Sequence, residues 1–182
     1  MMNSRIRPKL VAFDLDGTVW TPDMYMLWGG GAPFEIKDPT KTLVDRSGQE
    51  VNLLGEVGSI LHELHTQPEW KGTIISWVSC TDEPTWANEC LMKFVTPVSA
   101  TPLKNLVDSS AEQIFKANKK EHFRRLKAAY PEIDYSEMIF FDNEAGNIRS
   151  VSQAGVLSIH CNEGMTREVW DYGLDLFHKE RS

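Results

Sequence analysis

Residues 13–18 read F-D-L-D-G-T. Phe13, the first of them, is also the last residue of a short apolar run, Leu10–Phe13. An apolar run of this length between polar residues is typical of a strand that is buried on both faces. Two carboxylates, Asp14 and Asp16, therefore stand where a buried strand ends. Burial is unfavourable for an ionised carboxylate unless a cation or hydrogen-bond donors compensate the charge. A pair of acids at this place indicates a functional site.

The chain has 182 residues and a formal net charge of −7. This length suits one domain, and we expect residues 1–182 to form it, with residues 20–54 as a lid or hairpin insertion after the first strand. The negative charge disfavours nucleic acid and anionic membranes as partners. No apolar segment approaches the roughly 20 residues of a membrane span, and the odd, widely spaced cysteines do not suggest a disulfide framework. We expect a monomer in a reducing compartment, the cytoplasm or the nucleus.

Short apolar runs alternate with helical periods along the chain. Strands are expected at residues 10–13, 73–78, 113–115, 138–141 and 156–159. Helices are expected at residues 55–66, from 84, from 119, from 144 and after 166, with a further helical turn at 103–107. Residues 20–54 lack a helical period and are expected to form a loop with short strands at 42–46 and 50–54. The alternation predicts an α/β fold with three layers: a doubly wound, mostly parallel sheet with helices on both faces, and no large cap domain.

In sheets of this kind, ligands bind at the carboxyl ends of the strands. Polar groups follow several of the expected strands: Asp14 with Asp16, Ser79, Lys119, and Asp142 with Asn143. Carboxylate and amide oxygens suit a hard cation such as magnesium, whereas a hydroxyl and an ammonium suit phosphate oxygens. A carboxylate can attack phosphorus, and a second acid can protonate the leaving group and then activate water. The set therefore predicts phosphoryl transfer through an aspartyl phosphate.

The stretch F-D-L-D-G-T resembles the first motif, D-x-D-x-T, of the haloacid dehalogenase (HAD) superfamily. The three later motifs of that superfamily are matched by Ser79, by Lys119 and by the pair Asp142 and Asn143. More narrowly, the chain resembles the eukaryotic magnesium-dependent acid phosphatase family. The resembling stretches are D-L-D-G-T-V-W, D-R-S-G-Q-E-V-N-L, V-S-C-T-D-E, K-K-E-H-F-R-R-L, F-F-D-N-E-A-G-N-I and I-H-C-N-E-G-M. They are spread over nearly the whole chain.

The resemblance implies a role for each matching residue. Asp14 would be the nucleophile and would bind Mg²⁺ through its other oxygen. Asp16 would be the general acid and base, with its backbone carbonyl on the metal. Lys119 would also restrain Asp14, and Thr18 would form a hydrogen bond near Asp16. The implied metal site consists of Asp14, Asp16, Asp142 and Asn143, and the implied phosphate site of Ser79, Cys80, Lys119 and Thr18.

Four positions depart from the family pattern. Asn143 replaces an expected acid, which removes one negative charge and weakens the predicted metal site; the sequence leaves open whether Asp142 or Asn143 is the direct ligand. Gly17 stands where the narrower family often has a tyrosine, and Cys80 where it tends to have an arginine. Residues 96–111 look longer than the family's equivalent. These last three departures concern substrate preference.

Several assignments have competitors. Lys116 and Lys120 lie near Lys119, which is preferred for its spacing to His122 and Phe123. The residues Trp20, Trp28 and Gly29–Gly31 either line the substrate entrance or form only a packed lid. Cys80 lies next to the site, and for it an inert packed thiol is favoured over a redox-sensitive one.

The sequence thus predicts a magnesium-dependent phosphomonoesterase with an open site. Such a site suits a phosphorylated small molecule or a phosphoprotein, and the resemblance implies phosphotyrosine or phosphorylated sugar-amine substrates. A phosphotransferase or mutase, and a catalytically inactive regulatory binding protein with the same fold, stay open as alternatives.

Overall fold

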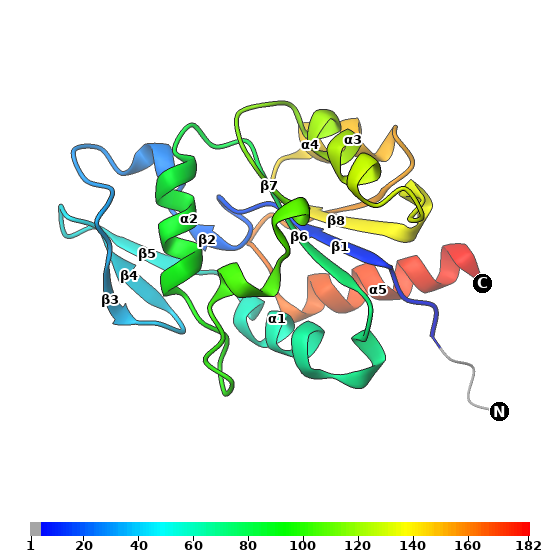
Figure 1. The fold of residues 1–182 in the computed structure, drawn as a ribbon, viewed down its shortest axis with the longest axis horizontal. Coiled ribbons are helices and arrows are strands. Elements are labelled where there is room, and N and C mark those ends of the chain that lie inside the picture. The colour runs from blue at the N-terminus through cyan, green and yellow to red at the C-terminus, as the bar shows by residue number, and fades with distance from the viewer. Residues whose placement is uncertain (1–4) are drawn as a thin grey trace.

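The structure, a computed structural model, describes residues 5–182 and is built on a five-stranded parallel sheet (Figure 1). The strand order is β7-β6-β1-β8-β9, so the order reverses at β1. The bounds are β1 (Leu10–Phe13), β6 (Ile74–Ser79), β7 (Glu112–Ile114), β8 (Met138–Asp142) and β9 (Leu157–His160). All four neighbouring pairs are parallel. The predicted doubly wound sheet is confirmed.

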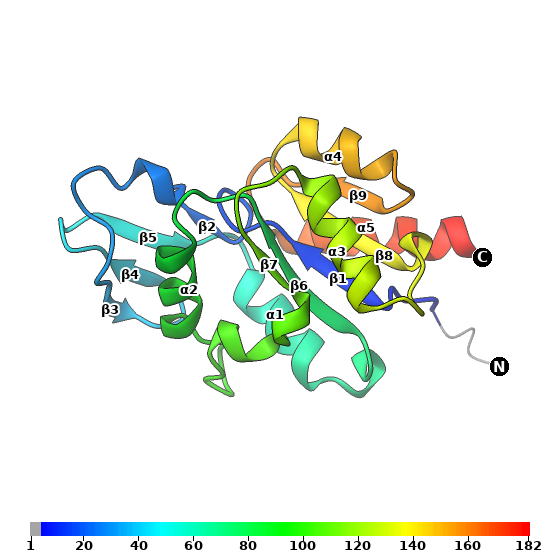
Figure 2. The same ribbon diagram turned by 45° about the horizontal axis from the view of Figure 1, so that its top comes forward.

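Helices cover both faces of this sheet. Figures 1 and 2 show α1 (Val57–Thr66) and α5 (Arg167–Arg181) on one face, and α3 (Lys119–Ala129) and α4 (Ala145–Ser152) on the other. The side chain of Asn118 caps α3 by accepting a hydrogen bond from the backbone N–H of Glu121 at 3.0 Å. This cap fixes where α3 begins, because it satisfies a backbone donor that the helix itself leaves unpaired. The first residue of α3 is Lys119.

Strand β1 lies in the middle of the core, and all four of its residues are fully buried. It has β6 on one side and β8 on the other, which explains its unbroken apolar sequence. The ring of Phe13 stacks on Phe141 and Trp170, with centroids 5.6 and 6.3 Å apart. Burying one such side chain contributes about 1.5–3 kcal/mol. The rigid strand that results positions the acids that follow it.

Residues 20–53 form a second, antiparallel sheet with the order β2-β5-β4-β3, to the left in Figure 1. Its strands are β2 (Trp20–Thr21), β3 (Glu35–Asp38), β4 (Thr42–Val44) and β5 (Glu50–Leu53). The two predicted short strands correspond to β4 and β5, whereas β2 and β3 were not predicted. Across residues 5–182 this small sheet is the extent of the insertion after β1, and no large cap domain is seen.

Helix α2 (Pro84–Lys93) packs against the segment between β2 and β3. A Cβ atom at Gly31 would lie 2.2 Å from the ring of Trp86, so the segment approaches the helix too closely for a side chain there. The remaining helical turns are η1 (Met24–Met26), η2 (Pro68–Trp70), η3 (Leu103–Leu106), η4 (Ser109–Ala111) and η5 (Tyr135–Glu137). Within the described part of the chain, no helix has the length and apolarity to cross a membrane.

Candidate active site

The carboxyl ends of the parallel strands bring the predicted polar residues together. Asp14 follows β1, Ser79 ends β6, Asp142 ends β8, and Lys119 begins the helix after β7. Their exposed fractions are 6, 2, 0 and 1%, respectively. Charged side chains are rarely buried to this degree without partners, so the contacts among them decide what the site can do.

Lys119 lies at the centre of these contacts. Its Nζ is 2.5 Å from Oδ1 of Asp14 and 3.4 Å from Oδ2 of Asp142, and it donates a hydrogen bond to the carbonyl oxygen of Val78 at 2.5 Å. Burial disfavours the ammonium, but the two carboxylates outweigh this effect, and the pKa of Lys119 is raised. Lys119 is therefore charged, and it holds the carboxylate of Asp14 in place.

The neighbouring lysines point elsewhere. Nζ of Lys116 is 2.6 Å from Oδ1 of Asp82, and both side chains are exposed. Lys120 donates to the side-chain oxygen of Gln153 at 3.2 Å, also on the surface. Of the three lysines, Lys119 is the one that lies in the buried site.

Both carboxylate oxygens of Asp16 accept hydrogen bonds. The indole Nε1 of Trp20 donates to Oδ1 at 2.7 Å, and the backbone N–H of Met24 donates to Oδ2 at 3.2 Å. Burial, with a smaller contribution from the charge of Asp14, raises the pKa of Asp16 to about 7 against the lowering effect of both donors. A carboxyl group with a pKa near neutrality can both give and take a proton in one reaction cycle.

Thr18 was expected to form its hydrogen bond near Asp16, and this expectation is wrong. Its hydroxyl lies 3.4 Å from Oδ2 of Asp14 and accepts a hydrogen bond from the backbone N–H of Asn143 at 3.1 Å. The reason is a tight turn, in which the N–H of Thr18 donates to the carbonyl oxygen of Leu15 at 3.1 Å. This turn brings Thr18 back toward the strand ends, where it joins the first and fourth motifs.

The donor set suits a hard dication. Asp14 and Asp142 bring two carboxylates against the single ammonium of Lys119, which leaves an excess negative charge in a buried place. Burial, and then the charge of Asp14, raise the pKa of Asp142 to about 7, a sign that this excess is unfavourable. Within residues 5–182, no three His, Cys, Asp or Glu side chains gather to hold a metal, so neutral oxygens such as the Asp16 carbonyl and the Asn143 amide would have to complete a magnesium site.

Two residues beside Asp142 were missed by sequence reasoning. Asn147 donates from Nδ2 to Oδ2 of Asp142 at 3.0 Å, and the backbone N–H of Glu144 donates to Oδ1 at 2.7 Å. Both residues also line the pocket. The available signal was their place at the start of α4, which directs the first turn of that helix toward the end of β8.

The two departures from the family pattern at Gly17 and Asn143 are neighbours in space. Gly17 has a φ of +78°, and a Cβ atom there would lie 2.3 Å from Nδ2 of Asn143. The absence of a side chain at Gly17 therefore leaves the room that the amide occupies. A tyrosine could not stand at this position with the present backbone and the present Asn143.

The pocket at this end of the sheet has a volume of about 110 Å³. Its lining consists of Asp14, Asp16, Asp23, Tyr25, Ser79, Cys80, Thr81, Asp82, Glu144 and Asn147. Cys80 is exposed in it, so the expectation of a packed thiol is wrong; partial desolvation raises the pKa of this thiol, which keeps it protonated and weakly reactive. Tyr25, from the insertion after β1, is exposed at the rim, whereas Trp20 is buried and Trp28 is exposed to solvent.

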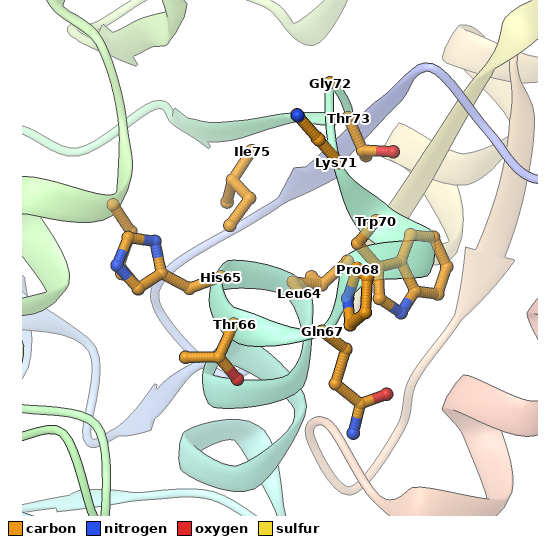
Figure 3. Close-up of a pocket in the computed structure, with 11 residues that line it drawn as sticks. Leu64, His65, Thr66, Gln67, Pro68, Trp70, Lys71, Gly72, Thr73 and Ile75 are labelled. Carbon is orange, nitrogen blue, oxygen red and sulfur yellow. The ribbon is translucent and has the colours of Figure 1, made fainter.

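A larger cavity of about 380 Å³ lies at the opposite end of the sheet (Figure 3). It is formed by the end of α1, the turn η2 and the residues that enter β6. Its ionisable lining residues, His65 and Lys71, are exposed and have no charged partner among the described residues. Volume therefore does not identify the active site here, and the chemistry of the buried side chains does.

The chain is similar in sequence to known proteins. The profile of a family described as Acid Phosphatase matches residues 6–180. A human protein named Magnesium-dependent phosphatase 1 is 34% identical over 175 residues, which cover 96% of this chain and 90% of the human one. A HAD-like hydrolase superfamily protein of Schizosaccharomyces pombe is 30% identical over 150 residues, which cover 82% of this chain and 83% of the yeast one.

Solved structures share the fold. One is the N-terminal part of a Bacteroides fragilis protein, which contains a phosphatase domain and was solved with Mg; it matches with a TM-score of 0.62 and 20% identity over 97% of this chain and 42% of that chain. Another is a HAD-superfamily hydrolase from Ehrlichia chaffeensis, with a TM-score of 0.55 and 14% identity over 98% of this chain and 100% of that chain. At these identities the likeness concerns the fold.

Proposed function

This chain belongs to the acid phosphatase family of the HAD superfamily, and on that premise we propose that it is a magnesium-dependent phosphomonoesterase that works through an aspartyl phosphate on Asp14. The observation that carries the proposal is the environment of Asp14. Its carboxylate stands at the end of β1, is held by Lys119 on one oxygen and approached by Thr18 on the other, and lines the same pocket as Asp16. A fixed carboxylate with a near-neutral acid beside it is what covalent phosphoryl transfer needs.

The proposed reaction has two steps. In the first, an oxygen of Asp14 attacks phosphorus, the bond from phosphorus to the leaving oxygen breaks, and Asp16 gives its proton to that oxygen. In the second, the ionised Asp16 takes a proton from a water molecule, whose oxygen attacks phosphorus and releases phosphate and free Asp14. Lys119 and Ser79 face the negative oxygens of the transferred group throughout.

Mg²⁺ would supply positive charge that stabilises the transferring phosphoryl group. We propose that Asp142 is the direct carboxylate ligand beside Asp14, because both contact Lys119 and thus face one point. Asn143 would contribute through its amide at most, since its side-chain oxygen also lies 3.4 Å from the Thr18 hydroxyl.

The rim of the pocket favours a substrate with a positive charge or an aromatic ring outside the phosphate. Asp23, Asp82 and Glu144 line the pocket in addition to the reacting acids, and Tyr25 is exposed beside them. Carboxylates around the leaving group attract an ammonium, and a tyrosine offers a face for a ring. We therefore propose a phosphorylated sugar-amine or a phosphotyrosine in a protein as the substrate, with residues 20–54 acting as the lid beside which it binds.

A screen of phosphate esters in Mg²⁺, run with the wild type and with Asp14→Asn, tests the function. We expect turnover of several esters by the wild type, loss of turnover in Asp14→Asn, and a hydroxylamine-sensitive phosphoenzyme after acid quench. Equal turnover by both proteins would overturn the proposed mechanism. Added alcohols as acceptors decide between water and a second substrate, because phosphorylated alcohol among the products would favour the phosphotransferase alternative.

A further inference from the structure

Asp16 is held entirely by residues of the insertion that follows it. The donor to Oδ1 is the side chain of Trp20 in β2, and the donor to Oδ2 is the backbone of Met24 in η1. The bond from Trp20 is 2.7 Å long and that from Met24 is 3.2 Å, so the indole makes the closer contact. A backbone donor survives any change of side chain, whereas the indole donor depends on the residue at position 20.

The indole N–H differs from most side-chain groups because it can donate a hydrogen bond but cannot accept one. The oxygen that faces Trp20 must therefore stay an acceptor when Asp16 is protonated, and so must Oδ2, because the backbone N–H of Met24 is also a donor only. In a carboxyl group the hydroxyl oxygen is the weaker acceptor, so the proton is favoured on Oδ2, whose bond is the longer of the two. A short bond to a donor-only group thus fixes the orientation of the carboxyl group and also selects the oxygen that carries the proton.

The position of Trp20 is itself well determined. The side chain is fully buried, and its ring stacks on Phe94 at the end of α2 with centroids 6.2 Å apart. Its backbone pairs with Leu53 in β5 and also forms a bridge with Asp16. The ring and the backbone of Trp20 are both packed, so the indole N–H already points at Asp16 before substrate binds. No rotation of this side chain has to be restricted when substrate binds.

We propose that Trp20 is a positioning residue for Asp16: it holds Oδ1 as an acceptor, so that Oδ2 carries the proton given to the leaving group. The inference rests on the proposed function, because it refines the proton transfers of that reaction. In the first step the proton passes from Oδ2 to the leaving oxygen as its bond to phosphorus breaks. In the second step Oδ2 takes a proton from the attacking water.

The chain offers a matched control in Trp77. This tryptophan is also fully buried, in β6, and its ring packs 6.0 Å from that of Phe13. Within residues 5–182, its indole N–H has no hydrogen-bond partner. Trp77→Phe and Trp20→Phe therefore make the same change of volume, but only the second removes a hydrogen bond to Asp16.

The test compares substrates that differ in their need for an acid. p-Nitrophenyl phosphate has a leaving group that departs without a proton, whereas benzyl phosphate requires one. We expect Trp20→Phe to lower kcat/KM for benzyl phosphate by on the order of 10-fold or more, part of the roughly 10²- to 10⁴-fold that general acid catalysis contributes. The loss with p-nitrophenyl phosphate should be several times smaller, and Trp77→Phe should leave the ratio of the two substrates unchanged.

An equal loss on both substrates in Trp20→Phe, or the same change of ratio in Trp77→Phe, would overturn the inference, since a structural defect does not depend on the leaving group. Failure of the proposed function looks different: the wild type would then turn over neither ester.

A second measurement leaves Trp20 in place, so it tests the inference even if the Trp20→Phe protein does not fold. We expect the indole proton resonance of Trp20 to move upfield in Asp16→Ala while that of Trp77 stays in place, because a bond to a charged acceptor is lost. An unmoved Trp20 resonance contradicts the proposal.

Discussion

At the scale of single residues, the site is a balance of charge around Lys119. One ammonium faces two carboxylates, Asp14 and Asp142, and all three are almost fully buried. Removing one partner of a buried ion pair lowers the stability of the fold strongly, because the remaining charge stays desolvated and has lost its partner. The arrangement is therefore stable with the lysine, and a bound cation relieves it further.

Replacing Lys119 tests this balance. We expect Lys119→Met to abolish turnover and, in EDTA, to lower the free energy of unfolding by about 3–5 kcal/mol. Added Mg²⁺ should recover part of the loss, since it supplies positive charge at the same place. Urea unfolding in EDTA and in Mg²⁺ measures both effects, and Lys116→Met, which breaks an exposed pair with Asp82, should leave stability nearly unchanged. Equal losses in the two variants would contradict the burial argument.

A second residue-scale prediction concerns the space over Gly17. Both Gly17 and Gly29 have positive φ, +78° and +72°, but a Cβ atom would meet Asn143 at the first and nothing within 4 Å at the second. An alanine costs about 1–2 kcal/mol at either position for the left-handed backbone. We expect Gly17→Ala to lose about 1 kcal/mol or more beyond Gly29→Ala because of the clash.

The difference between the two alanine variants should vanish when Asn143→Ala is combined with Gly17→Ala, as chemical denaturation can measure. If the double variant keeps the full extra loss, the clash is not with Asn143.

The sequence predicted which residues meet at this site but not their hydrogen bonds. The motif spacing places Asp14 and Asp142 at strand ends and Lys119 at a helix start. The parallel topology then brings these ends to one edge of the sheet. The partners of Asp16 and Thr18 could not be read in this way, since they depend on the curl of the turn after β1. A pairing set by a few backbone angles leaves no periodic trace in the sequence.

At the scale of elements, the lid is held to α2 by a pair of charged residues. Oε1 of Glu89 accepts hydrogen bonds from the backbone N–H of Phe34 at 2.8 Å and from Nζ of Lys93 at 2.7 Å. Lys93 also donates to the carbonyl oxygen of Phe34. One i,i+4 pair thus satisfies both backbone groups of a buried lid residue, as a neighbouring strand would.

Removing the lysine should loosen the lid without unfolding the core. We expect Lys93→Met to reduce the hydrogen-exchange protection of the Phe34 N–H on the order of 10-fold, in line with the roughly 1–3 kcal/mol cost of an unpaired buried group. Protection in β1 should stay unchanged. The control is Lys37→Met, which breaks an exposed pair with Glu50 in the same sheet. A similar effect in both variants would show that Phe34 is not fixed through Lys93.

A pH dependence belongs to α3 and the loop before it. The ring nitrogens of His122 lie 2.9 Å from the carbonyl oxygen of Phe115 and 3.0 Å from that of Asn118. Burial, with help from the Lys119 charge, lowers the pKa of His122 below its ordinary value of 6.5 although both carbonyls oppose this shift. Below about pH 6.5 the unfolded chain therefore binds a proton that the folded chain does not, and stability falls as the pH falls.

We expect the free energy of unfolding to depend less steeply on pH between 5 and 7 in His122→Gln than in the wild type. Each unit of separation between the folded and unfolded pKa corresponds to about 1.4 kcal/mol. Urea unfolding across this range measures the slope, and His65→Gln, at an exposed histidine, serves as the control. An unchanged slope in His122→Gln would rule out this titration.

Elements that bury most of their side chains were predicted well, whereas the exposed strand β3 was not. The buried runs of β1, β6 and β8 and the period of α1 follow directly from their apolar residues. By contrast, β3 reads Glu-Ile-Lys-Asp and buries none of these side chains, so no alternation marks it. Its pairing with β4 comes from a neighbour in the fold and not from its own sequence.

At the scale of the whole molecule, the site lies where the main sheet, the lid and α3 meet. Asp14 comes from β1, Asp142 from β8 and Lys119 from α3, while Asp16 is held by the lid. Separation of any of these units therefore separates the groups that bind the metal and the phosphate. A ligand that binds only the assembled site must stabilise the whole fold.

Magnesium should therefore raise the unfolding temperature, and the residue at position 143 should set by how much. A saturating ligand adds about 2.7 kcal/mol at 100 times its Kd. We expect Asn143→Asp to be less stable than the wild type in EDTA, because a third carboxylate joins Asp14 and Asp142, and to gain more from Mg²⁺, because that charge favours the metal. Thermal unfolding in EDTA and across a Mg²⁺ titration measures both.

Asn105→Asp adds the same charge at an exposed position and should respond to Mg²⁺ as the wild type does. Asp142→Asn should lose most of the response, because it removes the proposed carboxylate ligand. If Asn143→Asp gains no more from Mg²⁺ than Asn105→Asp, the side chain at position 143 does not face the metal. The departure from the family pattern there would then leave the metal site unaffected and act through its contact with Gly17 alone.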